Sequence, residues 1–137
     1  MKYLKKFKLF EDISKRSSKE DVLKALSEIK TLGTVNPIDG RDMYIDGINI
    51  ELRYWDGYLW IGSIYVISEE RGQGKATRLI QKICDIADKY GVFIGLTPTQ
   101  FGNDKNALND EQLENFYKKF GFKEKDDIDI FEREPKK

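Results

Sequence analysis

The chain has no histidine and only one cysteine among its 137 residues. Without imidazole it cannot build a Ser-His-Asp triad, a Cys-His nucleophile pair or a histidine-ligated zinc or haem site. A single cysteine, Cys84, excludes an internal disulfide, a CxxC redox pair and an iron–sulfur cluster. Acid–base chemistry must therefore use tyrosine, aspartate, glutamate, lysine, Cys84, the backbone or water.

Long apolar runs and an excess of charge are also missing. No stretch approaches the ~18 apolar residues of a membrane-spanning helix, and the basic start over residues 2–8 lacks the apolar run of a signal peptide. Lysine and arginine number 24, as do aspartate and glutamate, so no nucleic-acid partner is indicated. We expect one cytoplasmic domain over residues 1–137, because 39% hydrophobic residues suffice for a core. The oligomeric state stays open, a homodimer included.

Hydrophobic periodicity predicts the elements of the first half of the chain. Residues 3–10 alternate loosely and predict a first strand. Ser18 offers an N-cap for a helix that ends at Gly33. Residues 34–46 contain proline and glycine and are interpreted as a loop. The strongest β pattern is a hairpin, with strands over 48–55 and 58–67.

In the second half the period changes from two to about 3.6 after Gly74 and predicts a helix up to Gly91. A strand over 92–98 and a loop over 99–108 follow. A helix then begins at Asn109 or Asp110 and ends at Gly121, and residues 122–133 form one or two last strands around Asp126-Asp127. The order predicts an α/β (α+β) fold, with a mixed, mainly antiparallel sheet flanked by helices.

The junction at residues 64–80 takes a strand through a glycine-containing turn directly into a helix. Helix N-termini bind anions through backbone N–H groups and the helix dipole, and Arg71 and Lys75 add positive charge. A tight turn that needs glycine only for its dihedral angles is the alternative. A P-loop is excluded by Ala76, and the dinucleotide fingerprint by Thr77, which stands where its third glycine would be.

The run Arg71-Gly72-Gln73-Gly74-Lys75-Ala76 fits the pattern [Q/R]-x-x-G-x-[G/A] after a strand. The run Asn115–Phe122 is similar to an FYxKxGF signature at the end of a last helix. Together, in this order, they resemble the phosphate loop and the closing helix of the GCN5-related N-acetyltransferases (GNAT). The resemblance covers about residues 58–133 and implies the acyl-CoA N-acyltransferase fold.

The resemblance implies acetyl-CoA as co-substrate. Backbone groups of Ile64, Tyr65 and Val66 would bind the pantetheine arm and the acetyl carbonyl. The N–H groups of residues 72–77 would hold the pyrophosphate, so the expected binding residues of the loop are Arg71, Gly72, Gln73, Gly74, Lys75, Ala76 and Thr77. The 3′-phosphate would be reached by Lys75, Arg78 or Lys82, among which the sequence does not choose.

The same resemblance makes Tyr117 the acid that protonates the leaving thiolate, four residues before Gly121. The alternative is an amphipathic tyrosine on a packed helix. Asn109 stands one residue out of register with the family's helix-start asparagine, which contacts the cofactor, and an ordinary N-cap explains Asn109 or Asp110 equally well.

A dedicated base is less evident, because Thr97 stands where many relatives have a glutamate. Glu51 is the best carboxylate on the hairpin, on the same strand face as Asn49 and Arg53. An ordinary solvated face explains these three residues as well. A chain of water molecules or Asp104 are the other candidates for the proton acceptor.

Two further groups have ordinary structural explanations. Trp55, Tyr58 and Trp60 gather around the hairpin turn, where they pair across strands or line an acceptor pocket. Cys84 lies mid-helix between apolar residues and is interpreted as a small core residue.

These features predict an acetyl-CoA-dependent N-acetyltransferase that acetylates a primary amine of a small molecule, a protein or an aminoacyl-RNA. Direct attack on the thioester needs no covalent enzyme intermediate. The alternatives are a non-catalytic binding or inhibitor protein with the same fold, and a small nucleic-acid-binding domain that uses residues 2–19.

Overall fold

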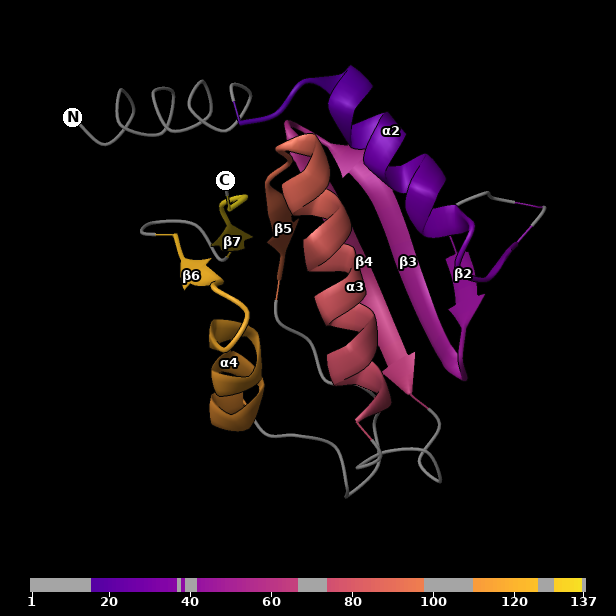
Figure 1. Ribbon diagram of the computed structural model, residues 1–137. Coiled ribbons are helices and arrows are strands. Elements are labelled where there is room, and N and C mark those ends of the chain that lie inside the picture. The colour runs from indigo at the N-terminus through magenta and orange to yellow at the C-terminus, as the bar shows by residue number, and fades with distance from the viewer. Residues whose placement is uncertain are drawn as a thin grey trace.

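The computed structural model describes residues 16–36, 38, 42–66, 74–97, 110–125 and 130–136. They form a seven-stranded sheet with three helices (Figure 1). The strand order is β1-β2-β3-β4-β5-β7-β6, and every neighbouring pair is antiparallel except β4 and β5. The predicted mixed, mainly antiparallel sheet is confirmed. The strand predicted over residues 3–10 lies outside the described residues.

Helix α2 (Lys19–Lys30) begins where its cap was predicted. The Ser18 hydroxyl accepts a hydrogen bond from the backbone N–H of Asp21 at 3.1 Å, which satisfies one donor of the first turn. The apolar positions Val22, Ala25, Leu26 and Ile29 recur at helical spacing and are buried.

The loop predicted over residues 34–46 is wrong, because the structure places strands β1 (Thr34–Val35) and β2 (Asp42–Ile45) there. Strand β2 pairs along its whole length with the following strand and buries Met43 and Ile45. Four residues between loop signals are too few for periodicity to reveal a strand. Asp46 and Gly47, with φ of 49° and 81°, form the turn that ends it.

The predicted hairpin is confirmed as β3 (Ile48–Trp55) and β4 (Tyr58–Val66), joined at Asp56-Gly57. Its register shifts once. Leu52 pairs with Ile61 whereas Glu51 pairs with Ser63, so Gly62 is an extra residue in β4. Such a bulge bends a strand and increases its local twist.

Helix α3 (Lys75–Tyr90) ends at Gly91, which adopts a left-handed conformation with φ of 67°. Strand β5 (Ile94–Leu96) follows and pairs with β4 in parallel, as the strand–helix–strand order predicted. It is shorter than the predicted span of residues 92–98.

The last elements are helix α4 (Asp110–Lys118), strand β6 (Lys123–Glu124) and strand β7 (Phe131–Arg133). Gly121 follows the helix with φ of 96°, as expected for a helix-ending glycine. Both last strands form, with β7 between β5 and β6. The turn predicted at Asp126-Asp127 lies outside the described residues.

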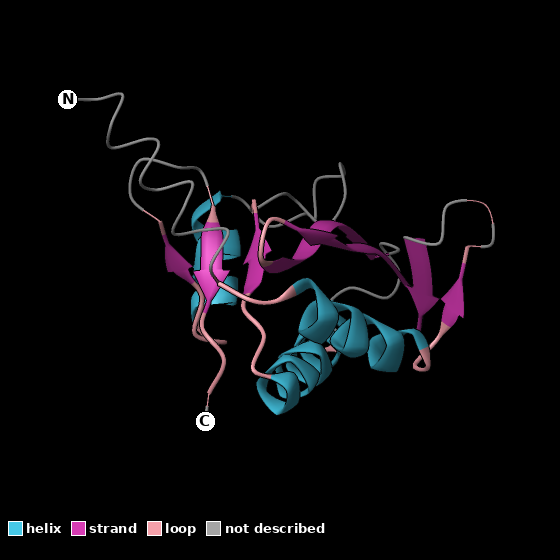
Figure 2. Cartoon of the chain, turned by 90° about the horizontal axis from the view of Figure 1, so that it is seen from above, coloured by secondary structure: helices cyan, strands magenta, loops and turns pink. Residues whose placement is uncertain are grey.

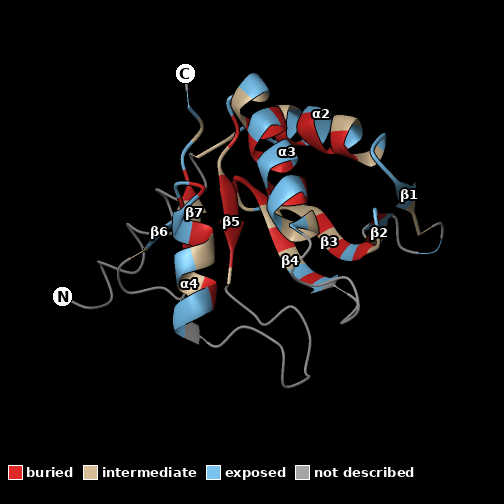
Figure 3. Cartoon of the chain, turned by 60° about the horizontal axis from the view of Figure 1, so that its bottom comes forward, coloured by how far each residue is buried: buried red, intermediate tan, exposed pale blue. Residues whose placement is uncertain are grey.

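Helices α2 and α3 lie together on one face of the sheet (Figure 2). In Figure 3 buried residues run along β4 and β5, while the outer side of α3 is exposed. The core joins both helices to the sheet and includes Ile29, Ile50, Leu59, Ile80, Ile83 and Ile94. None of the helices among the described residues is both long and apolar enough to span a membrane.

Candidate functional site

Strand β4 continues well past its parallel neighbour. The β4–β5 pairs run from Leu59–Ile94 to Ile61–Leu96, but β4 extends to Val66. No described strand pairs with β4 on that side beyond Ile61. The diverging segment therefore offers one backbone edge to an extended, amide-bearing ligand, which can pair with it as an added strand does.

The bulge at Gly62 lies at the start of this diverging segment, and the Glu51 side chain lies against it. A Cβ added at Gly62 would stand 2.5 Å from Glu51 Oε1, so the carboxylate occupies the space that a side chain would fill. Glu51 is half-buried and pairs across the sheet with Asp42 and Ser63. The proposed base is thus placed where β4 leaves β5.

The next residues of the site are at the first turn of α3. The N-cap is Gly74, with φ of 74°, which has no side chain to accept a hydrogen bond from the turn. The turn also contains no acidic residue, unlike that of α2, which has Ser18 as its cap and two carboxylates. The positive end of the α3 dipole is therefore not neutralised by its own first turn.

Basic side chains gather at the same place. Lys75 Nζ lies 3.8 Å from Asp46 Oδ1, and one guanidinium nitrogen of Arg78 lies 3.2 Å from the position of a Cβ added at Gly74. Lys82 is exposed two turns further along the same side of the helix. Because Asp46 is itself well exposed, solvent screens its charge and weakens its interaction with Lys75.

The predicted cofactor residues divide into two groups. Ile64 is buried, so its backbone is the part that can face a ligand, while Tyr65 is 51% exposed and Val66 ends β4. Gly74 and the three residues after it form the start of α3. The predicted cofactor residues Arg71, Gly72, Gln73 and Asn109 lie outside the described residues, as does Asp104, a candidate proton acceptor.

Tyr117 lies in the core with only 2% of its surface exposed. Its ring packs against Phe116 and Phe122, with centroid distances of 5.3 and 5.5 Å. Burial raises the pKa of the Tyr117 phenol, so the hydroxyl stays protonated throughout the neutral range. This position is consistent both with a tyrosine that only packs in the core and with one that donates its proton. The acid role stays a prediction.

The hairpin aromatics pair across the strands as predicted. The Trp55 ring lies 4.7 Å from Trp60 and 6.3 Å from Tyr58, measured between centroids. Gly95 makes room for them, since a Cβ there would stand 2.9 Å from Tyr58 Cγ and 3.0 Å from Trp60 Cε3. Cys84 is buried in the core, and burial raises its pKa to about 11, which keeps the thiol protonated.

Sequence reasoning missed two residues near these elements. Gly62 carried a usable signal, because a glycine inside a strand often marks a bulge or a close approach. Arg133 carried none. It shares the buried face of β7 with Phe131, and its carboxylate partner, Asp88, comes from helix α3, which is distant in sequence.

The profile of the acetyltransferase (GNAT) domain matches residues 35–124, which include the hairpin, the β4–α3 junction and α4. The chain belongs to the GNAT family. The crystal structure of the anti-CRISPR protein AcrVA5 has a similar fold, with a TM-score of 0.53 and 22% sequence identity over 66% of this chain and 94% of that chain. No curated protein matches this GNAT chain in sequence.

Proposed function

We propose that this GNAT protein is an acetyl-CoA-dependent N-acetyltransferase that transfers the acetyl group directly to a primary amine. The observation that carries the proposal is the nearness of two features. The edge of β4 with which no described strand pairs beyond Ile61 ends near the start of α3 (Figure 1), where Gly74 provides no capping side chain. An extended arm that carries a diphosphate can bind to this combination, with the arm on the strand edge and the diphosphate at the helix N-terminus.

The described residues fit such a ligand. Backbone groups from Ile64 to Val66 would pair with the amides of the pantetheine arm, and the first turn of α3 would hold the diphosphate. Arg78 and Lys75 would add charge-assisted contacts to phosphate oxygens. Bound here, acetyl-CoA supplies an activated thioester.

Glu51 would accept the proton that the substrate ammonium loses before attack. The amine nitrogen then bonds to the acetyl carbon as the carbon–sulfur bond breaks, and Tyr117 gives its proton to the sulfur. Glu51 returns its proton to solvent, and water reprotonates Tyr117. The buried, protonated Cys84 is consistent with transfer that needs no acyl-enzyme.

Acetyl-CoA binding is tested first, by thermal shift and calorimetry on the full chain. Thr77→Glu adds a carboxylate to the first turn of α3, where it interacts favourably with the helix dipole but repels a diphosphate. We expect unchanged or higher stability without ligand and at least ~10-fold weaker acetyl-CoA binding. Thr77→Gln is the uncharged control and should bind normally. No stabilisation of the parent protein by saturating acetyl-CoA would reject the proposal and favour a non-catalytic binding or inhibitor protein.

Turnover is tested by release of the free thiol, with a polyamine, a lysine-rich protein and an aminoacyl-RNA as acceptors. Tyr117→Phe removes the hydroxyl but keeps the ring contacts with Phe116 and Phe122. We expect kcat to fall about 100-fold, while acetyl-CoA affinity changes less than twofold. Unchanged kcat would remove Tyr117 from the acid role.

The role of Glu51 is tested by two variants, one that removes its carboxylate and one that moves it. Glu51→Gln removes the base, whereas Gly62→Ala keeps the carboxylate but displaces it from the bulge. Because the displaced atoms are the end of a flexible side chain, Gly62→Ala should fold normally. If Glu51 is the base, both variants lower kcat at neutral pH. If water relays the proton, both keep parental turnover.

A further inference from the structure

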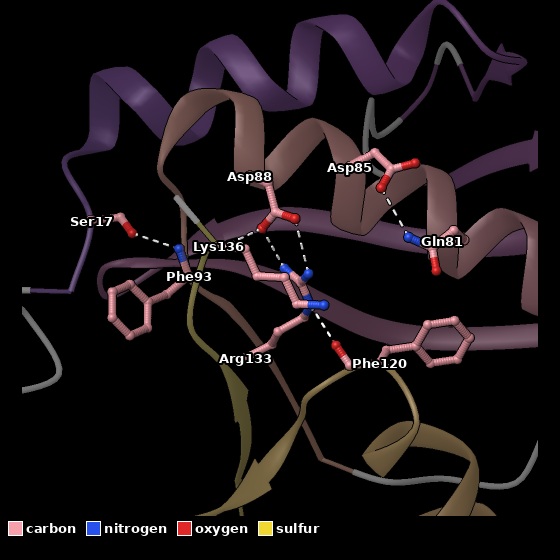
Figure 4. Close-up of polar contacts among 8 residues, drawn as sticks. All are labelled: Ser17, Gln81, Asp85, Asp88, Phe93, Phe120, Arg133 and Lys136. Atoms are coloured by element: carbon pink, nitrogen blue, oxygen red, sulfur yellow. Dashed lines mark hydrogen bonds and ion pairs between the residues drawn. The ribbon is translucent and has the colours of Figure 1, made fainter.

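Arg133 places a buried guanidinium between three segments that are distant in sequence (Figure 4). Its Nε donates to the carbonyl oxygen of Phe120 at 2.7 Å, and its two terminal nitrogens donate to the Asp88 carboxylate at 2.8 and 3.0 Å. Only 2% of Arg133 is exposed. A charge this deep is tolerated only when it is paired and hydrogen-bonded, and all three nitrogens of this guanidinium are engaged.

Asp88 anchors the first side of this bridge in the last turn of α3. Its Oδ1 also accepts a hydrogen bond from the backbone N–H of Lys136 at 2.8 Å. Partial burial alone would raise the pKa of Asp88, but the hydrogen bonds from Arg133 and Lys136 hold it below its usual value. The carboxylate is therefore ionised at neutral pH, and the ion pair is complete.

Phe120 anchors the other side in the turn that follows α4. The backbone N–H of Phe120 donates to the carbonyl of Tyr117 at 3.0 Å, and that of Phe122 donates to the same carbonyl at 3.4 Å. A Cβ added at Gly121 would lie 3.9 Å from Arg133 Nε, so the turn passes close to the guanidinium. The peptide that Arg133 holds thus lies between two peptide groups whose N–H groups donate to the Tyr117 carbonyl.

Helix α4 packs into the core through Leu113 and Tyr117, and Arg133 adds a polar contact to the turn that follows it. In Figures 1 and 3 it stands beside the C-terminal end of β5, on the far side of that strand from α3. Stability alone does not require a guanidinium here, since an apolar replacement of a buried ion pair is often neutral or stabilising. A planar fork with fixed donor directions, by contrast, fixes the distance and the angle between the segments it joins.

We propose that Arg133 is a positioning residue, which fixes the turn after α4 against the end of α3 and thereby sets the place of the Tyr117 ring. The inference rests on the proposed function, in which Tyr117 is the acid. Strand β7, which carries Arg133, would then contribute to catalysis without contacting the substrate.

The kinetic test is a double-mutant cycle on the full chain. Arg133→Lys keeps the charge, but one ammonium cannot serve Asp88 and the Phe120 carbonyl with the same geometry. We expect kcat to fall about tenfold, with the KM for acetyl-CoA changed less than twofold, because Asp88 lies about 20 Å along α3 from Lys75, where the diphosphate would bind. In the Tyr117→Phe background Arg133→Lys should cause no further loss. Equal losses in both backgrounds would show that Arg133 does not act through Tyr117.

The second test needs no activity. The Tyr117 ring signals, assigned with Tyr117→Phe in protein carrying labelled tyrosine, should shift in Arg133→Lys. They should stay in place in Lys89→Ala, which removes an exposed ion pair one residue from Asp88. Unchanged ring signals in folded Arg133→Lys would overturn the positioning role. A shift in a protein that neither binds nor uses acetyl-CoA would refute the proposed function alone.

A variant that fails to fold does not end the test. Combining Arg133→Met with Asp88→Leu replaces the ion pair by apolar side chains and leaves no buried charge unpaired. We expect this protein to fold and to show the same shift of the Tyr117 ring. A folded double variant with parental ring signals and parental kcat would contradict the inference.

Discussion

The two ends of α3 are built in opposite ways. At its C-terminal end the backbone N–H groups of Gly91 and Val92 donate to the last carbonyls, and Asp88 is joined to Arg133. Lys89 adds a surface ion pair with Glu28. At its N-terminal end Gly74 provides no side chain, and the first turn has no carboxylate.

This difference separates the anchored end of the helix from the end at which we propose that the cofactor binds. Helix termini leave backbone groups that need partners, and a protein can satisfy them internally or offer them to a ligand. Here one end is satisfied by the chain itself and holds the helix in place. The other end then keeps a fixed direction for its dipole without contributing to the anchor.

The largest effect should come from breaking the anchored end. Arg133→Met leaves the Asp88 carboxylate without its partner, and we expect the free energy of unfolding in urea to fall by about 3 kcal/mol. Adding Asp88→Leu should recover most of this loss, and acetyl-CoA affinity should stay parental in any folded variant. A loss below about 1 kcal/mol would mean that the anchor lies elsewhere.

The two glycines that bound α3 allow the sharpest comparison. Gly74 and Gly91 both have positive φ, so alanine at either should cost about 1 kcal/mol of stability through backbone strain. A Cβ at Gly91 meets nothing within 4 Å, which makes Gly91→Ala the matched control. Only Gly74→Ala should also weaken acetyl-CoA binding in calorimetry. Equal binding by both variants would contradict the assignment of the two ends.

Acidification should weaken the C-terminal anchor of α3 by protonating Asp88. Because its pKa is lower in the folded protein, Asp88 contributes stability above its unfolded pKa, and this contribution is lost as pH falls through the folded pKa. The free energy of unfolding should therefore decrease below about pH 4, and less so in Asp88→Asn. Urea titrations at several pH values measure this slope.

The smallest effect should come from the exposed pair at the same end. Lys89 Nζ lies 2.6 Å from Glu28 Oε1, but surface ion pairs contribute little in salt. Lys89→Ala should leave the urea midpoint within experimental error. A shift as large as that of Gly91→Ala would show that surface charge, and not Arg133, holds this end.

Sequence patterns predicted the elements that carry long, clean periodicity. Helices α2 and α3 and the β3–β4 hairpin appear where apolar spacing placed them, and Ser18 caps as predicted. The loop predicted over residues 34–46 was wrong because β2 is held by pairing with β3, which a four-residue pattern cannot reveal. Short strands depend on partners that lie elsewhere in the chain.

The candidate site divides in the same way. The glycine-rich junction and the tyrosine helix were visible as motifs, because each lies within one short run of residues. The contact between Glu51 and Gly62, and the bridge from Arg133 to Asp88 and Phe120, depend on register and packing between distant segments. No spacing rule within one segment encodes such contacts.

Because Gly95 has no side chain, Trp60 packs closely against β5, and its fluorescence is sensitive to the contact between β4 and β5. Trp60 lies directly over the backbone of β5 at that position, with Trp55 beside it, and these are the two tryptophans of the whole chain. Any event that separates β5 from β4 exposes an indole to water and shifts its emission to longer wavelength. A separation of β4 from β5, if it occurs, would therefore be visible in tryptophan fluorescence without any label.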